Sequence, residues 1–268
     1  MKKILLAFGA VAAVMIALPL FSAFEAHVIN VTAQIENALS VPVKSIDFGT
    51  VFPQEKLDKP LAISLSDSFI AEGGVDDVEY IIRQKPKCAV TNEDGTRIVG
   101  PTWTGHVVVG DNPFTTNVTE TYYVDCDADR PIEVLPHPNP EFWLLPSLCE
   151  YISKHSDTDE VQQNDDSLNS FHQPFTVGTS TISWLDTKGR LAKSDAVTGT
   201  TTGDVIDTWT IDLAVPCFGG YCAQDWDDFV LGHNPEADPD QYTQPIGNEH
   251  KVFGCDLWVE TTRVSRIN

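Results

Sequence analysis

Alternation of apolar and polar residues is the dominant pattern along this chain, and it predicts short β-strands rather than helices. In 208–215 every odd-numbered position is apolar, while positions 208, 210 and 212 are polar. A strand of this kind packs one face on a core. Similar runs rich in β-forming residues lie at 61–66, 78–83, 106–109, 119–124 and 257–262. Turn-forming residues separate the runs, so we predict an all-β fold, a jelly-roll-like sandwich of two sheets.

Three polar stretches interrupt the strand pattern. The first, near 130–174, is rich in proline, aspartate and serine and contains a helix-like turn at 147–152. The second, near 217–251, contains a short helix pattern at 224–230. We expect both to be insertions of loops and short helices that cysteines hold against the sandwich. The third, 188–203, is polar and rich in threonine, and we expect it to be a connection without a strand.

The N-terminal region has the pattern of an export signal. Lys2 and Lys3 precede an unbroken apolar stretch at 4–20, and small residues follow it, as in a secretory signal peptide. We expect a signal peptide at 1–23, cleaved after Ala23, and a protein that is secreted or displayed at the cell surface. The alternative is an uncleaved N-terminal anchor, because the apolar stretch is about long enough to span a bilayer.

The next segment, 24–37, contains a strongly alternating strand pattern, and a single domain follows at 38–268. One face of the predicted strand carries the apolar residues Ile29, Val31, Ala33 and Ile35. Two roles for it are open. It is either the first strand of its own sheet or a donor strand that completes the sheet of a neighbouring copy. In the second case a head-to-tail contact that does not close generates a filament.

Six cysteines form an even set in a chain expected to be exported, which favours disulfides. Cys217 and Cys222 flank a glycine-containing turn, and we predict a bridge between them. The remaining four are Cys88, Cys126, Cys149 and Cys255. They allow three pairings, and the sequence does not choose among them. A zinc site is the rival interpretation, but no C-x-x-C pair or matching histidine spacing is present.

The chain is strongly acidic, with a net charge of −22 from 39 acidic and 17 basic residues. Such a surface repels phosphate groups, so we expect no nucleic-acid partner and no membrane contact except through the N-terminal segment. The hydrophobic content of 42% is ordinary for a globular protein and excludes wholesale disorder.

The sequence contains no motif that indicates catalysis. The zinc-protease motif H-E-x-x-H, the G-x-S-x-G elbow, the P-loop and the dinucleotide fingerprint are all absent. Adjacent aspartates occur at 76–77 and 225–228. Paired carboxylates catalyse glycoside hydrolysis, but in so acidic a chain we interpret these as solvated surface. We therefore predict that the protein is not an enzyme and uses no catalytic cofactor.

A structural calcium ion is the one cofactor left open. Aspartates alternate at 125–129 as at the start of a calcium loop, but Arg130 and Pro136 stand where an EF-hand needs glycine and glutamate. Aspartates at 225–228 or 238–240 are the other candidates.

Aromatic residues suggest an alternative function. Five tryptophans are candidates for a glycan-binding face: Trp103, Trp143, Trp184, Trp226 and Trp258. A tryptophan in a sandwich is more often a core residue. The alternative is therefore a monomeric surface adhesin that binds glycan or calcium through its insertions.

Two segments, 24–36 and 43–55, resemble the start of proteins of the TasA/camelysin family. In these exported proteins an early strand follows the signal, and a turn of the type found here at 49–53, Gly-Thr-Val-Phe-Pro, opens a jelly-roll domain. The resemblance covers roughly residues 1–70. It implies a subunit of an extracellular fibre or biofilm matrix that polymerises by donor-strand complementation. Some camelysins are described as metalloproteases, but this sequence has no motif that carries that activity. The predicted function is therefore a secreted fibre subunit.

Overall fold

The computed structural model describes residues 35–91, 97–98, 103–110, 121–126, 141–156, 166–194 and 203–266. The chain divides into two units, Met1–Ile35 and Glu36–Asn268, and the fold below is that of the second. The expected signal peptide and most of the expected N-terminal strand, including Ile29, Val31 and Ala33, lie outside the described residues.

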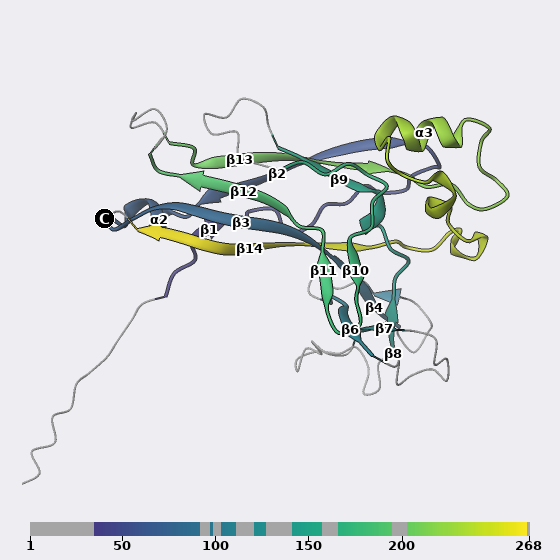
Figure 1. Ribbon diagram of the computed structural model, residues 1–268, viewed down its shortest axis with the longest axis horizontal. Helices are drawn as coiled ribbons and strands as arrows, with labels where there is room; N and C mark the ends of the chain where they lie inside the picture. The colour runs from purple at the N-terminus through teal and green to yellow at the C-terminus, as the bar shows by residue number, and fades with distance from the viewer. Residues whose placement is uncertain are drawn as a thin grey trace, which may run out of the picture. The chain divides into compact units, whose positions relative to one another are not determined.

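Two antiparallel sheets form the centre of this unit. The larger has the order β1–β2–β13–β9 and is made of Leu39–Ser40, Lys56–Leu65, Ile206–Ala214 and Ile152–His155. The smaller has the order β12–β3–β14 and is made of Thr187–Ala192, Val75–Pro86 and Cys255–Arg266. In Figure 1, β2 and β13 lie over β3 and β14. The predicted all-β fold is confirmed, and the jelly-roll topology stays a prediction.

The core lies between these two sheets and is built from alternate positions of their longest strands. Each of the following side chains is at most 4% exposed: Leu61 and Ile63 in β2, Val78, Tyr80 and Ile82 in β3, and Trp209, Ile211 and Leu213 in β13. Burial of each large apolar side chain stabilises the fold by about 1.5–3 kcal/mol. The alternation read from the sequence therefore marks the faces that meet in the core.

Three side chains within this core, those of Tyr80, Asp207 and Trp209, are joined by hydrogen bonds. The Tyr80 hydroxyl donates to the Asp207 carboxylate and accepts from Trp209 Nε1 at 2.7 Å. Gly189 of β12 pairs with Tyr80 of β3, and a Cβ atom at Gly189 would overlap the Tyr80 ring. The prediction that 188–203 lacks a strand is therefore wrong, because its first part belongs to β12. The close approach of the Tyr80 ring requires glycine at position 189 of this strand.

In the part of the chain that the structure describes, three smaller antiparallel sheets accompany the sandwich. They have the strand orders β5–β4–β8, β6–β7 and β10–β11. Their strands are β4 (Cys88–Thr91), β5 (Arg97–Ile98), β6 (His106–Val109), β7 (Tyr122–Asp125), β8 (Glu141–Leu144), β10 (Phe175–Val177) and β11 (Ile182–Trp184). β6 matches a predicted strand, and β7 overlaps the strand predicted at 119–124.

The stretch 130–174 needs a correction, because it is not only an insertion. Its residues Ile152–His155 form β9 and pair with β13 in the larger sheet. This strand contains Ser153 and Lys154, which are 2% and 0% exposed. A strand with buried polar residues does not show the apolar alternation on which the prediction depends. The helix-like turn expected at 147–152 is the 3₁₀-helix η2 (Cys149–Tyr151).

Within the described ranges, helical elements are few and short. α2 (Asp67–Ala71) follows β2, and Ser66 caps it by accepting a hydrogen bond from the Phe69 amide at 3.1 Å. The stretch 217–251 contains α3 (Trp226–His233), η3 (Pro239–Tyr242) and η4 (Ile246–Asn248). Trp226 is 5% exposed and meets the buried Phe171 edge to face, with ring centroids 5.7 Å apart. This contact attaches α3 to the core.

All six cysteines are paired in three disulfides. Cys217 and Cys222, the pair expected from the sequence, are joined. The pairs that the sequence left open are Cys88–Cys126 and Cys149–Cys255. Three disulfides indicate a non-reducing, extracellular environment. Among the described residues, no helix combines the length and apolar character needed to cross a membrane.

Candidate functional site

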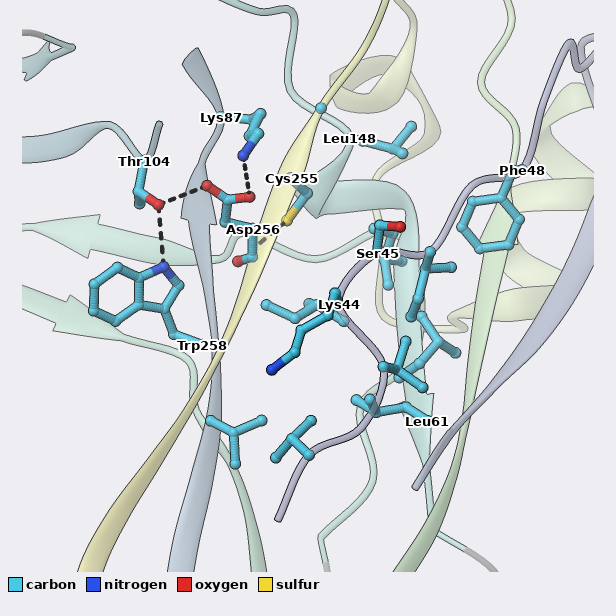
Figure 2. Close-up of a pocket in the computed structure, with 18 of the residues that line it drawn as sticks. Lys44, Ser45, Phe48, Leu61, Lys87, Thr104, Leu148, Cys255, Asp256 and Trp258 are labelled. Carbon is cyan, nitrogen blue, oxygen red and sulfur yellow. Dashed lines mark hydrogen bonds and ion pairs between the residues drawn. The ribbon is translucent and has the colours of Figure 1, made fainter. Parts of the chain in front are cut away.

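A groove with a volume of about 800 Å³ lies between β14 and the segment 41–48 (Figure 2). Both large sheets contribute to its walls. Its apolar lining residues include Val41, Val43, Ile46, Leu61, Ile152, Ile211, Leu257 and Val259. The groove therefore opens toward the core of the sandwich and presents an apolar surface to whatever enters it.

The segment 41–48 forms one wall without being a strand. It follows β1 directly, and none of its residues pairs in a described sheet. Val43, Ile46 and Phe48 are partly buried against the core. The segment ends in a turn, in which the Gly49 amide donates to Asp47 Oδ1 at 2.8 Å and Gly49 has φ +71°. A positive φ is readily adopted by glycine, so this turn fixes where the wall ends.

The opposite wall is an edge strand. Within the described part of the chain, β14 pairs with β3 on one side and with no strand on the other. The unpaired side of an edge strand presents backbone donors and acceptors that template the addition of another strand. Figure 2 shows Lys44 extending from the 41–48 segment toward β14. The groove thus combines an apolar floor with an unpaired sheet edge.

A hydrogen-bonded polar chain also lines the groove, on the side of β14 that faces away from the segment 41–48 (Figure 2). Lys87 Nζ lies 2.8 Å from Asp256 Oδ1, and the Thr104 hydroxyl donates to Asp256 Oδ2 at 2.6 Å. Trp258 Nε1 donates to the Thr104 oxygen at 3.2 Å, and Lys85 Nζ lies 3.3 Å from the centroid of the Trp258 ring. Each of these groups has a partner, so the chain of contacts links β14 to Lys87 and Thr104.

A second polar cluster is buried between the sheets, away from solvent. Gln84 and Lys154 are each 0% exposed, and His172 is 6% exposed. Lys154 Nζ donates to Gln84 Oε1 at 2.7 Å, and His172 Nε2 lies 2.8 Å from the same oxygen. The Gln84 side-chain nitrogen donates to the carbonyl oxygens of Cys149 and Ile152 at 2.8 and 3.2 Å. The amide of Gln84 is therefore held in one orientation by four partners.

Burial shifts the pKa values of three ionisable side chains in and next to this cluster. It lowers the pKa of Lys154 to about 7, although the charge of Asp186 acts in the opposite direction. Burial, and then the charge of Lys154, lower the pKa of His172 to about 4. Burial also raises the pKa of Glu150, in η2, to about 7. In each case removal from water disfavours the charged form of the side chain.

Comparison with protein-family models, curated proteins and solved structures gave no match. The TasA/camelysin resemblance therefore stays a prediction, and the functional argument rests on this chain's own residues.

The predicted polymerisation strand is described at one position only. Ile35 is 92% exposed, whereas Ile29, Val31 and Ala33 lie outside the described residues. The groove itself was not expected from the sequence. Its one sequence signal is the set of apolar residues at 41–48, which lacks the regular alternation of a strand.

The candidate glycan-binding tryptophans lie on different elements. Trp143 is in β8, Trp184 in β11 and Trp258 in β14, while Trp226 of α3 is buried. These strands belong to three different sheets. The described tryptophans therefore do not form a single aromatic row on one sheet.

The candidate acidic sites take part in structural contacts. Asp77 is 9% exposed and pairs with Arg190 Nε at 3.0 Å, so its interpretation as solvated surface is wrong. Asp238 Oδ1 accepts from the Asp240 amide at 3.3 Å and begins η3. Asp225 Oδ1 accepts from Gln54 Nε2 at 3.2 Å. Among the residues that the structure describes, no three metal-ligating side chains gather, and the calcium ion stays a prediction.

Proposed function

We propose that this protein is a secreted structural subunit that assembles into an extracellular filament by donor-strand exchange. The segment 24–37 of one copy enters the groove beside β14 of the next copy. It then pairs with the unpaired edge of β14 and adds a fourth strand to the smaller sheet.

The observation that carries this proposal is the joint presence of an apolar groove and an unpaired strand edge at β14. Either feature alone is common. Together they match what an incoming strand needs, since backbone groups along the edge give register and pockets beneath it receive alternate side chains. Leu257 and Val259 of β14 supply part of the apolar surface.

The proposed donor has the complementary pattern. Its apolar residues Ile29, Val31, Ala33 and Ile35 stand at alternate positions, so all of them face one side of a strand. Burial of each larger residue contributes about 1.5–3 kcal/mol, which offsets the loss of freedom on association. The Ile35 side chain is 92% exposed, and contact of so large an apolar side chain with water is unfavourable. Burial in a neighbouring copy removes this contact.

The disulfides support the compartment that the proposal requires. Disulfides persist in the oxidising environment outside the cytoplasm. An extracellular filament of this kind would assemble in that same environment. The Cys149–Cys255 bridge also joins the end of β14 that borders the groove to η2. A groove wall held by a covalent link is better ordered before a donor arrives, which lowers the cost of binding.

Electron microscopy of two purified forms tests the proposal. One form begins at Phe24 and the other at Ala38, so that only the second lacks the donor segment. We expect filaments from the first form and monomers from the second, with equal β-sheet content by circular dichroism. Filaments from the form that begins at Ala38, or only monomers from both forms across salt and protein concentrations, would overturn donor-strand exchange.

A further inference from the structure

The point at which the donor segment leaves its own copy is fixed by hydrogen bonds. The Ser66 hydroxyl donates to the Asn37 carbonyl oxygen at 2.6 Å, and the Ser66 amide donates to the Ala38 carbonyl oxygen at 2.9 Å. The backbone from Ile35 to Asn37 spans at most about 7 Å. A donor that is bound through Ile35 therefore brings the end of the fold that carries Ser66 and α2 to the mouth of the neighbouring groove.

This end of the fold, which we call the exit end, carries exposed apolar side chains on two adjacent elements. Ile70 of α2 is 48% exposed, and Val205 and Ile206, where β13 begins, are 40% and 50% exposed. The Leu65 amide donates to the Val205 carbonyl oxygen at 2.9 Å, which places the start of β13 beside the chain that leads into α2. A single exposed apolar residue is ordinary, but several around the exit of the donor indicate a contact surface.

The opposite end, which we call the mouth end, adjoins the groove. In Figure 1, α2 lies at one end of the two large sheets, and the segment that leads into β14 lies at the other. Phe253 lines the groove and contacts the Phe218 ring, with centroids 6.4 Å apart. Around this pair Tyr221 is 77% exposed, Val252 55% and Ile246, in η4, 47%. The apolar lining of the groove therefore continues onto the surface of the mouth end.

Growth of a filament decides which ends meet. A donor that entered the groove from the exit end would bring two identical ends together, and reciprocal exchange would close a dimer. Open head-to-tail growth requires unlike ends to meet. The donor then enters beside Cys255, the first residue of β14, and runs antiparallel to β14. β3 has the same antiparallel direction on the other side of β14.

We propose that the exit end of one copy packs on the mouth end of the next and forms a second contact, separate from the strand in the groove. The side chains that meet are Ile70, Val205 and Ile206 of one copy, and Tyr221, Ile246 and Val252 of the next. This inference rests on the proposed function, because the donor segment determines which ends are brought together. The contact removes apolar surface of both ends from water, which favours association.

Two measurements separate the end contact from strand exchange. Binding of a synthetic peptide of residues 24–37 to the form that begins at Ala38 reports on the groove alone. Polymerisation of the form that begins at Phe24 reports on the groove and both ends. Tyr221→Asp and Ile70→Asp each place a carboxylate at an exposed position of one end, so the β-sheet content by circular dichroism should be unchanged.

We expect both variants to bind the peptide as tightly as the wild type. Their polymerisation should require a protein concentration about tenfold higher or more, because the contact would bury a carboxylate without a partner. Leu185→Asp is the matched control, since Leu185 is 42% exposed but lies between β11 and β12 and belongs to neither end. It should polymerise like the wild type.

Polymerisation of Tyr221→Asp and Ile70→Asp at the wild-type concentration would overturn the end contact and leave strand exchange intact. A closed dimer of the form that begins at Phe24 would also overturn it, because like ends would then meet. Failure of the peptide to bind the wild-type groove would instead overturn strand exchange, on which the end contact rests.

Discussion

Cys149 and Cys255 are bonded to each other with their Cα atoms 5.0 Å apart, and the bond joins η2 to the first residue of β14. Because η2 leads directly into β9, this bridge ties the larger sheet to the smaller one. The two cysteines are separated by 106 residues, so the bridge strongly restricts the unfolded chain.

Replacement of both cysteines by serine should therefore be costly. In the chain-entropy account, a loop of this length stabilises the fold by about 5 kcal/mol, and a five-residue loop by about 2 kcal/mol. We expect the Cys149→Ser/Cys255→Ser variant to lose distinctly more stability in urea unfolding than Cys217→Ser/Cys222→Ser, whose cysteines are 5 residues apart. Equal losses would show that loop closure does not govern the stabilisation.

Removal of the Tyr80 hydroxyl should destabilise the core. Tyr80→Phe leaves the buried Asp207 carboxylate without this donor and Trp209 Nε1 without its acceptor. Leaving a buried donor or acceptor without its hydrogen-bond partner costs about 1–3 kcal/mol. Thermal unfolding should show the loss, while Tyr221→Phe, at a tyrosine that is 77% exposed, should melt like the wild type.

Stability should depend on pH through Glu150. Burial raises the pKa of this carboxyl group to about 7, so between its unfolded value of 4.5 and 7 the folded state binds more protons than the unfolded state. The contribution of Glu150 is therefore fully present below about pH 4.5 and is lost as the pH rises through 7. Glu150→Gln has no such loss and should gain stability relative to wild type by up to about 3 kcal/mol at pH 8. Urea unfolding at pH 4.5, 7 and 8 measures the difference, and parallel pH profiles of the two proteins would contradict the assignment.

Polymerisation should depend on one face of the donor segment. Val31→Asp places a charge on the apolar face, so burial in the groove of a neighbour would require an unpaired carboxylate to leave water. We expect this variant to remain monomeric in light scattering. Thr32→Asp adds the same charge to the opposite face and should still form filaments. If both variants polymerise equally well, the apolar face is not what a neighbour binds.

An acidic substitution in the groove should have the complementary effect. Leu257→Glu places a carboxylate on the groove wall and should leave the copy unable to accept a donor. Its own segment 24–37 is intact, so it should cap growing wild-type filaments and shorten them. Val264→Glu, at an exposed position of the same strand, is the matched control. Unchanged filament lengths after addition of the Leu257→Glu protein would place the contact elsewhere.

The sequence predicts the strands whose two faces differ in polarity. β2, β3, β13 and β14 all contain runs identified from the sequence, because each has apolar residues at the core face. β9 and β12 were missed, since Lys154 and Gly189 are buried for reasons that involve a distant partner. Lys154 depends on Gln84, and Gly189 depends on the Tyr80 ring. Such residues have meaning only once the two sheets are brought together.

The groove also depends on residues that are far apart in the sequence. The sequence shows the apolar residues of 41–48, but their function as a wall depends on β14, which lies more than 200 residues later in the chain. Disulfide pairing is also a property of the folded chain. Cys217 and Cys222 are near each other in the sequence and were predicted to pair, whereas Cys88, Cys126, Cys149 and Cys255 required the positions of their strands.

The order of the strands has a mechanical consequence. In a filament of the proposed kind, tension reaches each subunit at β14 in one sheet and leaves through the residues that precede β1 in the other sheet. The load therefore crosses the core, where the Cys149–Cys255 bridge and the contact between Gln84 and Lys154 join the sheets. β14 and β3 share ten paired positions along their length. Force along these strands shears the hydrogen bonds between them all at once instead of opening them one by one, so β14 should stay attached to β3 under load.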